Sequence, residues 1–181
     1  MRSLRSPPAF FVRCTEAVAS PCCGEKLMPI GTRARKYRNS LSEQLTLRIR
    51  RLRCKCGKIH HELPDILVPY KRYEAACIEK VVSEPKGSAT IALDESTICR
   101  WKAWFRERIA HWIGGLVSIA IRFKLPVEVR SLPSQSVHQR IGHLVGHADG
   151  WLKRIVRPVV NANLWGYTRS ACTATSVSCR L

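Results

Sequence analysis

The chain has 181 residues, 45% of them hydrophobic, which supplies a modest core for about one to one and a half domains. Its 31 Lys and Arg against 13 Asp and Glu give a formal net charge of +18, which favours a polyanionic partner, and the charge alone does not choose among DNA, RNA and an anionic membrane surface. The longest apolar stretch, 109–121, is shorter than the ~20 residues that a bilayer span needs and contains His111 and Ser118, so neither a transmembrane helix nor a membrane partner is expected.

The nine cysteines indicate reduced thiols more than a disulfide framework. Their number is odd, and four of them fall in two short glycine-ended pairs while the others are scattered. A cytoplasmic location is therefore expected, on the nucleoid if the partner is DNA. The basic N-terminus contains one short apolar run, 9–12, too short for a signal-peptide core, and we expect residues 1–19 to be a disordered leader.

Residues 20–66 are expected to form a small three-stranded module. The segment 45–50 alternates apolar and polar residues with period two, which predicts a strand with one arginine-bearing face. Neighbouring strands are expected at 36–38 and 59–63, with a turn at 39–42.

The alternation of this strand changes phase after Arg50. Leu52 and Cys54 are therefore expected on the face opposite Ile49. A β-bulge at this place would instead aim Cys54 inward.

Two helices are expected next, separated by a Pro- and Gly-containing break. The first is predicted over 73–83. The second begins after Asp94, a suitable N-cap, and ends before Pro126. Its apolar residues follow spacings of three and four along one face: Ile98, Trp101, Phe105, Ile109, Trp112, Leu116 and Ile119.

Beyond Pro126 the pattern is weaker. It predicts a helix over about 134–148 and another that starts near Trp151 and stops at Pro158. Together the elements predict an α+β protein, a small three-stranded zinc-ribbon-like N-terminal module followed by an all-helical region with a helix-turn-helix. The expected division is a leader at 1–19, the ribbon-like module at 20–66, the helix-turn-helix at 67–106, a helical region at 107–167 and a tail at 168–181.

Two glycine-ended knuckles, 20–24 and 53–57, point to a structural zinc site. Structural zinc takes four thiolate or imidazole ligands in a tetrahedron, and tight Cys-x-x-Cys turns each deliver two thiolates. The candidate ligands are Cys22, Cys23, Cys54 and Cys56, with His60 or His61 as alternatives to Cys22 in the fourth place.

Both knuckles depart from the regular pattern. Ser20 stands where a leading cysteine would complete the first turn, and the second turn, Cys54-Lys55-Cys56, is one residue short. Two readings stay open: a zinc ion bound by irregular knuckles, or a ribbon that keeps its fold around a degraded or empty site.

From Leu52 through Phe105 the chain resembles a family of uncharacterised bacterial proteins, best known from Firmicutes, that carry a transposase-type zinc ribbon and a helix-turn-helix. The residues that carry the resemblance are 49–54, 59–73, 94–98, Arg100-Trp101 and Trp104-Phe105, with a looser likeness over roughly 20–170. The resemblance implies this fold and an association with mobile elements, and it implies no reaction.

Residues 26–58 contain eleven Lys or Arg against one acidic residue, Glu43. Such a one-sign stripe suits phosphate contacts, although solubility or an acidic protein partner would also account for it. In a helix-turn-helix the second helix reads the major groove with residues near its N-terminus, although the long connection between the two helices would make this a variant. The candidate nucleic-acid-binding residues are Arg48, Arg50, Arg51, Arg53, Lys71, Arg72, Ser96, Thr97, Arg100 and Lys102.

No catalytic residues are expected. A DNA-cutting transposase holds two metal ions with three carboxylates, and only Glu107, Glu128 and Asp149 follow residue 106, on segments that read as helices. The sequence thus predicts a non-enzymatic protein that binds duplex DNA and is accessory to a mobile element. The alternatives are an interaction module for a separate transposase or regulator, and a decayed transposon product.

Overall fold

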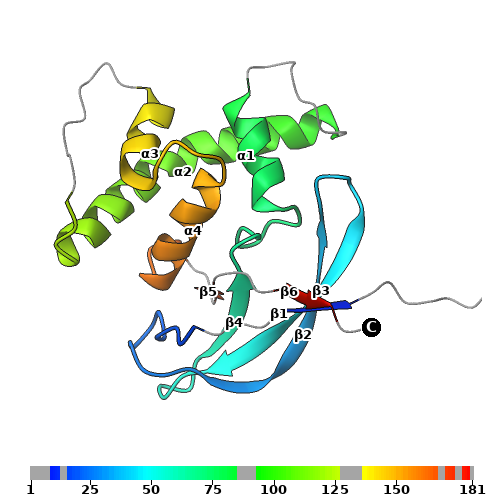
Figure 1. Cartoon of the computed structure of the whole chain (residues 1–181), viewed down its shortest axis with the longest axis vertical. Helices are drawn as coiled ribbons and strands as arrows, with labels where there is room; N and C mark the ends of the chain where they lie inside the picture. Colours follow the sequence, from blue (N-terminus) through cyan, green and yellow to red (C-terminus); the bar gives the residue numbers. More distant parts are fainter. Residues whose placement is uncertain are drawn as a thin grey trace, which may run out of the picture.

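The computed structural model of the chain describes residues 9–12, 16–84, 93–126, 136–166, 170–173 and 177–179. Its elements form a mixed α+β fold in which the helices gather above one sheet (Figure 1). The strands are β1 (Ala9–Val12), β2 (Met28–Arg38), β3 (Gln44–Arg53), β4 (Ile59–Pro64), β5 (Ser170–Thr173) and β6 (Val177–Cys179). The helices are α1 (Ala75–Ser83), α2 (Glu95–Arg122), α3 (Val137–Val145) and α4 (Trp151–Asn161).

Strand β3 organises the sheet. It pairs antiparallel with β2 along its whole length, from Gln44 opposite Arg38 to Arg53 opposite Met28. Its other edge is shared by β1, which runs parallel to it, and β4, which runs antiparallel. The three strands predicted from alternation are confirmed as parts of β2, β3 and β4.

Three strands, β1, β5 and β6, come from segments that the sequence pattern assigned to a leader and a tail. β5 pairs parallel with β4, and its Ala171 and Cys172 are fully buried. β1 lies within the expected leader and pairs with both β3 and β6. Strands of three or four residues are too short to show a period in the sequence, and β5 is buried on both faces. Of the expected leader, residues 1–8 and 13–15 lie outside the described residues.

The sheet has a separate core on each face. The main core joins residues such as Leu47, Ile49 and Leu63 to the helices. A smaller cluster contains Leu27, Leu52, Cys54 and Ala171. The predicted placement of Leu52 and Cys54 on the face opposite Ile49 is therefore confirmed, because they belong to the second cluster.

A β-bulge does occur beside this stretch, but it lies on β2. The register of β2 and β3 shifts between Pro29 and Gly31, so the extra residue is on β2 and the alternation of β3 continues unbroken. Cys54 thus turns toward the knuckle side of the sheet by ordinary alternation.

The apolar stripe of α2 is confirmed. Trp101, Phe105, Ile109, Trp112 and Leu116 are buried in the main core. No described helix combines the length and the apolarity that crossing a membrane requires.

Helix α4 departs from the sequence prediction because it continues past Pro158 to Asn161. The proline lacks the N–H of one helical hydrogen bond, but the residues after it, Val159 and Val160, are fully buried in the main core and hold the last turn. The start of α4 is capped from α1: the Glu79 carboxylate accepts hydrogen bonds from the backbone N–H groups of Gly150 and Leu152.

Candidate metal centre and nucleic-acid interface

Each knuckle is closed by its own backbone. In the first, Gly24 donates its N–H to the Ser20 carbonyl at 2.8 Å, and in the second Gly57 donates to the Cys54 carbonyl at 3.0 Å. Both glycines have positive φ, +73° and +83°, which a residue with a side chain adopts only with strain. The two turns therefore depend on glycine at these positions, and each presents its cysteines to the other.

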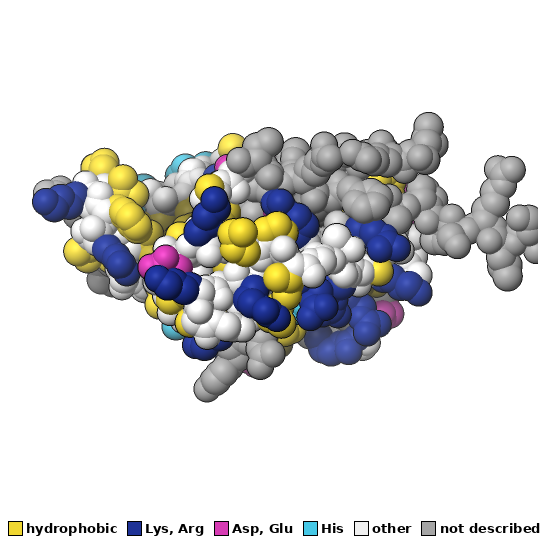
Figure 2. All heavy atoms as spheres, turned by 90° about the horizontal axis from the view of Figure 1, so that it is seen from below, with side chains coloured by type: hydrophobic (Ala, Val, Ile, Leu, Met, Phe, Trp, Pro, Cys, Tyr) yellow, Lys and Arg dark blue, Asp and Glu magenta, His cyan; other side chains and the backbone are white. Residues whose placement is uncertain are grey.

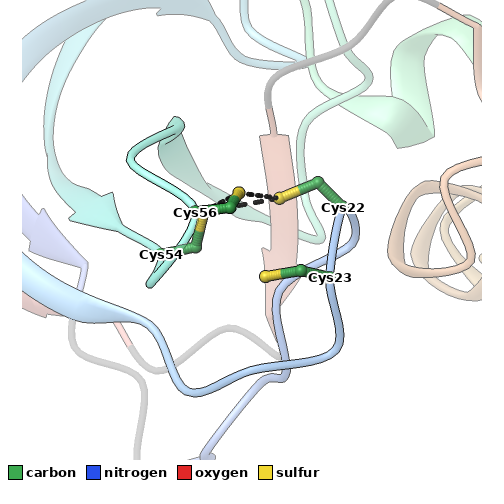
Figure 3. A group of neighbouring side chains, drawn as sticks. All are labelled: Cys22, Cys23, Cys54 and Cys56. Atoms are coloured by element: carbon green, nitrogen blue, oxygen red, sulfur yellow. Dashed lines mark hydrogen bonds between the residues drawn. The ribbon is translucent and has the colours of Figure 1, made fainter.

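The four predicted cysteines come together. Cys22 and Cys23 point from the first knuckle toward Cys54 and Cys56 on the second (Figure 3), and the four sulfurs lie within 4.8 Å of one another. The Cys22 sulfur is 3.4 Å from each of the Cys54 and Cys56 sulfurs. A zinc tetrahedron with bonds of about 2.3 Å has S···S edges of about 3.8 Å, so these four sulfurs lie close enough together to hold a metal ion.

Ser20 and His60 complete the surroundings of the cluster. The Ser20 hydroxyl lies 2.9 Å from the Cys22 sulfur, so the residue that replaces a cysteine contacts a thiol. His60 is buried and places Nε2 3.2 Å from the same sulfur, whereas its Nδ1 has no hydrogen-bond partner among the described residues. His61 lies elsewhere, with Nε2 3.5 Å from the Arg33 guanidinium. Its place as an alternative ligand is therefore wrong, because adjacent strand residues point to opposite faces.

The two thiols of the second knuckle have pKa values shifted in opposite directions. Burial raises the pKa of Cys54, but hydrogen bonds from Cys56, Cys22 and Ser20 outweigh it and lower that pKa to about 6. The pKa of Cys56 is raised to about 12, chiefly because it donates to Cys54 at 2.8 Å. The cluster thus favours a thiolate at Cys54, which is the protonation state that a metal requires.

The arginines of β3 divide by environment. Arg48 and Arg53 are exposed and Arg51 is half-buried. Arg50 forms a bidentate ion pair with fully buried Glu62, with Nε at 2.7 Å and NH2 at 2.6 Å from its oxygens. Its predicted role as a phosphate contact is corrected to a structural one, since two of its donors are occupied by a carboxylate.

The first turn of α2 is occupied by its own cap. Asp94 accepts hydrogen bonds from the Thr97 N–H at 2.8 Å, the Thr97 hydroxyl at 2.9 Å and the Ser96 hydroxyl. Thr97 is buried, and Lys102 donates to the Glu84 carbonyl at 2.8 Å. Thr97 is thus directed into the protein, half-buried Lys102 is held by a backbone carbonyl, and Ser96 is exposed but hydrogen-bonded to the cap residue.

Arg100 is the exposed cation of this turn. Its guanidinium reaches back to the Ser96 carbonyl at 3.2 Å and the Thr97 hydroxyl at 2.9 Å. Arg72 is also exposed, and half-buried Lys71 lies with Nζ 4.1 Å from the centre of the Trp104 ring.

The stability of the chain is expected to depend on the protonation of the Asp94 cap. Hydrogen bonds from Ser96, then from Thr97, lower the pKa of Asp94 from 3.8 to about 2. Because the folded-state pKa is the lower one, the stabilisation is complete above about pH 4 and is lost as the pH falls toward 2. We expect wild type to lose melting temperature across this window and Asp94→Asn, which keeps a capping oxygen, to lose less, as followed by circular dichroism. Equal losses would contradict the role of the carboxylate.

A groove of about 900 Å³ lies between β2 and the segment that leads to α1. Six basic side chains line it: Arg33, Arg35, Lys36, Arg38, Lys71 and Arg72. The basic residues of β2 were expected only as part of a charged stripe, and the groove was not predicted. The available signal was the alternation of Arg33 and Arg35 with the phase of Tyr37, which places them on the same face as that buried tyrosine.

Residues 20–101 match the family model of a domain of unknown function, DUF6431. The DUF6431 segment contains both knuckles, β2, β3, β4, α1 and the first turns of α2. This match agrees with the expected resemblance to an uncharacterised family. It covers residues 20–101, however, whereas the resemblance was expected over roughly 20–170. Searches of curated proteins and of solved structures return no match.

Proposed function

We propose that the protein is a non-enzymatic DNA-binding protein, related to the N-terminal region of transposases and accessory to a mobile element. The observation that carries the proposal is the composition of the hairpin of β2 and β3, which we call the basic hairpin. Its two strands carry eight Lys or Arg and no acidic residue. Phosphate contacts need such a one-sign surface, and an ordinary solvated face mixes signs.

The surface charge of the molecule and the position of the cysteines support a role of the basic hairpin in binding DNA. Figure 2 shows the chain from below the view of Figure 1, and dark blue side chains are spread over this face while magenta ones are few. Zinc held by the two knuckles would fix the end of the basic hairpin, because Cys54 and Cys56 directly follow β3. The metal would supply rigidity in this role and no reaction.

Helices α1 and α2 would act as a variant helix-turn-helix. Arg100 is exposed in the first turns of α2, the position from which a recognition helix reaches base edges. Lys71 lies close enough to Arg100 for the two charges to repel, since burial and then Arg100 lower the pKa of Lys71. This pair of cations would extend the basic hairpin toward the helix.

Binding of labelled duplex DNA, measured by fluorescence anisotropy, is expected to weaken steeply with salt. Each phosphate contact contributes about 0.9 to the slope of log affinity against log salt concentration. The double variant Arg48→Gln/Arg53→Gln is expected to lower the slope by about 2. The matched control Arg108→Gln/Lys153→Gln removes the same charge from exposed positions on α2 and α4 and is expected to change it little.

Flat binding across the salt range would reject the proposal. The interaction-module alternative would then gain weight, because Ile121, Phe123 and Leu125 form an exposed apolar group at the end of α2. A partner that stays bound to the chain after nuclease treatment, and is released by polar substitutions in this group, would establish that alternative.

A further inference from the structure

The groove beside β2 is a built feature of the fold. Its far wall, residues 70–74, is tied to the end of β2 by hydrogen bonds from the Arg38 N–H to the Arg72 carbonyl at 2.7 Å and from the Glu74 N–H to the Arg38 carbonyl at 3.0 Å. In Figure 1 the upper end of the β2–β3 hairpin rises beside the segment that enters α1. The two walls are therefore held in register by backbone bonds.

Among the described residues, no carboxylate forms an ion pair with a cation of the groove. Arg35 is half-buried and donates to the Val68 and Lys71 carbonyls at 3.2 and 3.0 Å. Arg38 lies over the Tyr73 ring, as Lys71 does over that of Trp104. Carbonyl dipoles and aromatic faces orient a cation but leave its full charge uncompensated.

The one acidic residue on the lining does not change this balance. Asp94 already accepts hydrogen bonds from Ser96 and Thr97. The ion pairs among the described residues are Arg50–Glu62 and Arg157–Glu16, and none of these four residues lines the groove. The pKa of Arg35 is lowered by burial and by repulsion from Arg33, so the groove holds like charges that a bound anion would relieve.

Tyr70 stands on the lining of this groove in an unusual backbone conformation. Its φ is +63° and the residue is 71% exposed. A bulky residue with positive φ is strained, and such strain is found at ligand-binding positions more than elsewhere. An exposed aromatic ring beside phosphate-binding cations is the arrangement on which unpaired bases stack.

We propose that this groove binds a nucleic-acid strand with unpaired bases, holding its phosphates with Arg33, Arg35 and Arg72 and stacking a base on Tyr70. The groove has the volume of a small-ligand site, which suits one or two nucleotides. In a paired duplex the faces of the bases are stacked against one another, so no base face is accessible to the ring of Tyr70. The inference rests on the proposed function and specifies which form of nucleic acid this site takes, for instance a strand end or an opened region.

The test compares a labelled single-stranded oligonucleotide with the blunt duplex of the same sequence in anisotropy titrations of the full chain. Wild type is expected to bind the single strand more tightly. Tyr70→Gly relieves the positive φ and removes the ring, and it is expected to weaken single-strand binding roughly 5- to 150-fold while duplex affinity changes about twofold or less. Tyr70→Phe is expected to restore most of this loss.

A second variant tests the phosphate contacts. Arg33→Gln is expected to lower the salt slope for the single strand by about 0.7, and Lys153→Gln, an exposed cation on α4, is expected to leave it unchanged. Equal effects of Tyr70→Gly on both probes, or none on either, would overturn the inference and leave the proposed function standing. Failure of wild type to bind either probe would overturn both.

Discussion

Cys54→Ala is expected to abolish zinc binding and to lower the melting temperature of the chain by about 6–12 °C, which corresponds to a loss on the order of 3 kcal/mol. Structural zinc stabilises small modules strongly, but here the knuckles share a sheet that also packs on the main core. We therefore expect only part of the free energy of zinc binding to appear as a loss of stability of the whole chain. Metal analysis of the purified wild type is expected to give one zinc per chain.

The matched control is Cys77→Ala, which removes another buried sulfur, this one in α1 and outside the cluster. It is expected to keep the metal and to lose only the packing contribution of one sulfur atom. A chelator should lower the melting temperature of wild type and Cys77→Ala and leave that of Cys54→Ala unchanged. A metal-free wild type whose melting temperature ignores the chelator would show that the ribbon folds around an empty site.

Arg50→Met is expected to destabilise the fold by about 3–5 kcal/mol, because it leaves the fully buried carboxylate of Glu62 without its charged partner. Methionine keeps much of the apolar length of arginine, so the loss reports the ion pair more than packing. Urea unfolding followed by circular dichroism measures it.

Arg48→Met is the control, since Arg48 lies two residues earlier on β3 and is exposed. It is expected to change stability by about 0.5 kcal/mol or less. The double variant Arg50→Met/Glu62→Leu should recover much of the loss, because no buried charge is then left unpaired. Equal stability of the two single variants would mean that the pair contributes nothing.

The sequence predicted those parts of the structure that depend on residues close together in the chain. Alternation located β3, the apolar stripe located α2, and the Gly-ended turns identified the four sulfurs of the candidate metal centre. Asp94 was recognisable as a cap because an N-cap depends on the next three residues. The helix-turn-helix and the DNA partner stay predictions.

The remaining features depend on pairing between distant segments. β5 is identified by its partner β4 and not by its own four residues. The Arg50–Glu62 pair follows from the register of β3 and β4, and the groove follows from the docking of residues 70–74 on β2. The positions of charged residues in the sequence do not reveal which strands pair or how they align. Arg50 was therefore predicted to contact phosphate, although the pairing of β3 with β4 places it against Glu62.

The position of β5 bears on how the molecule can be dissected. The stretch shared with DUF6431 ends at residue 101, yet the strand that covers the free edge of β4 comes from residues 170–173. Expressed alone, that stretch would present a bare hydrogen-bonding edge and lose α3, α4 and most of α2, which cover its apolar side, and both changes promote self-association. Residues 20–101 are therefore not expected to fold as an independent unit, and transferring them to another protein would require residues 170–173 as well.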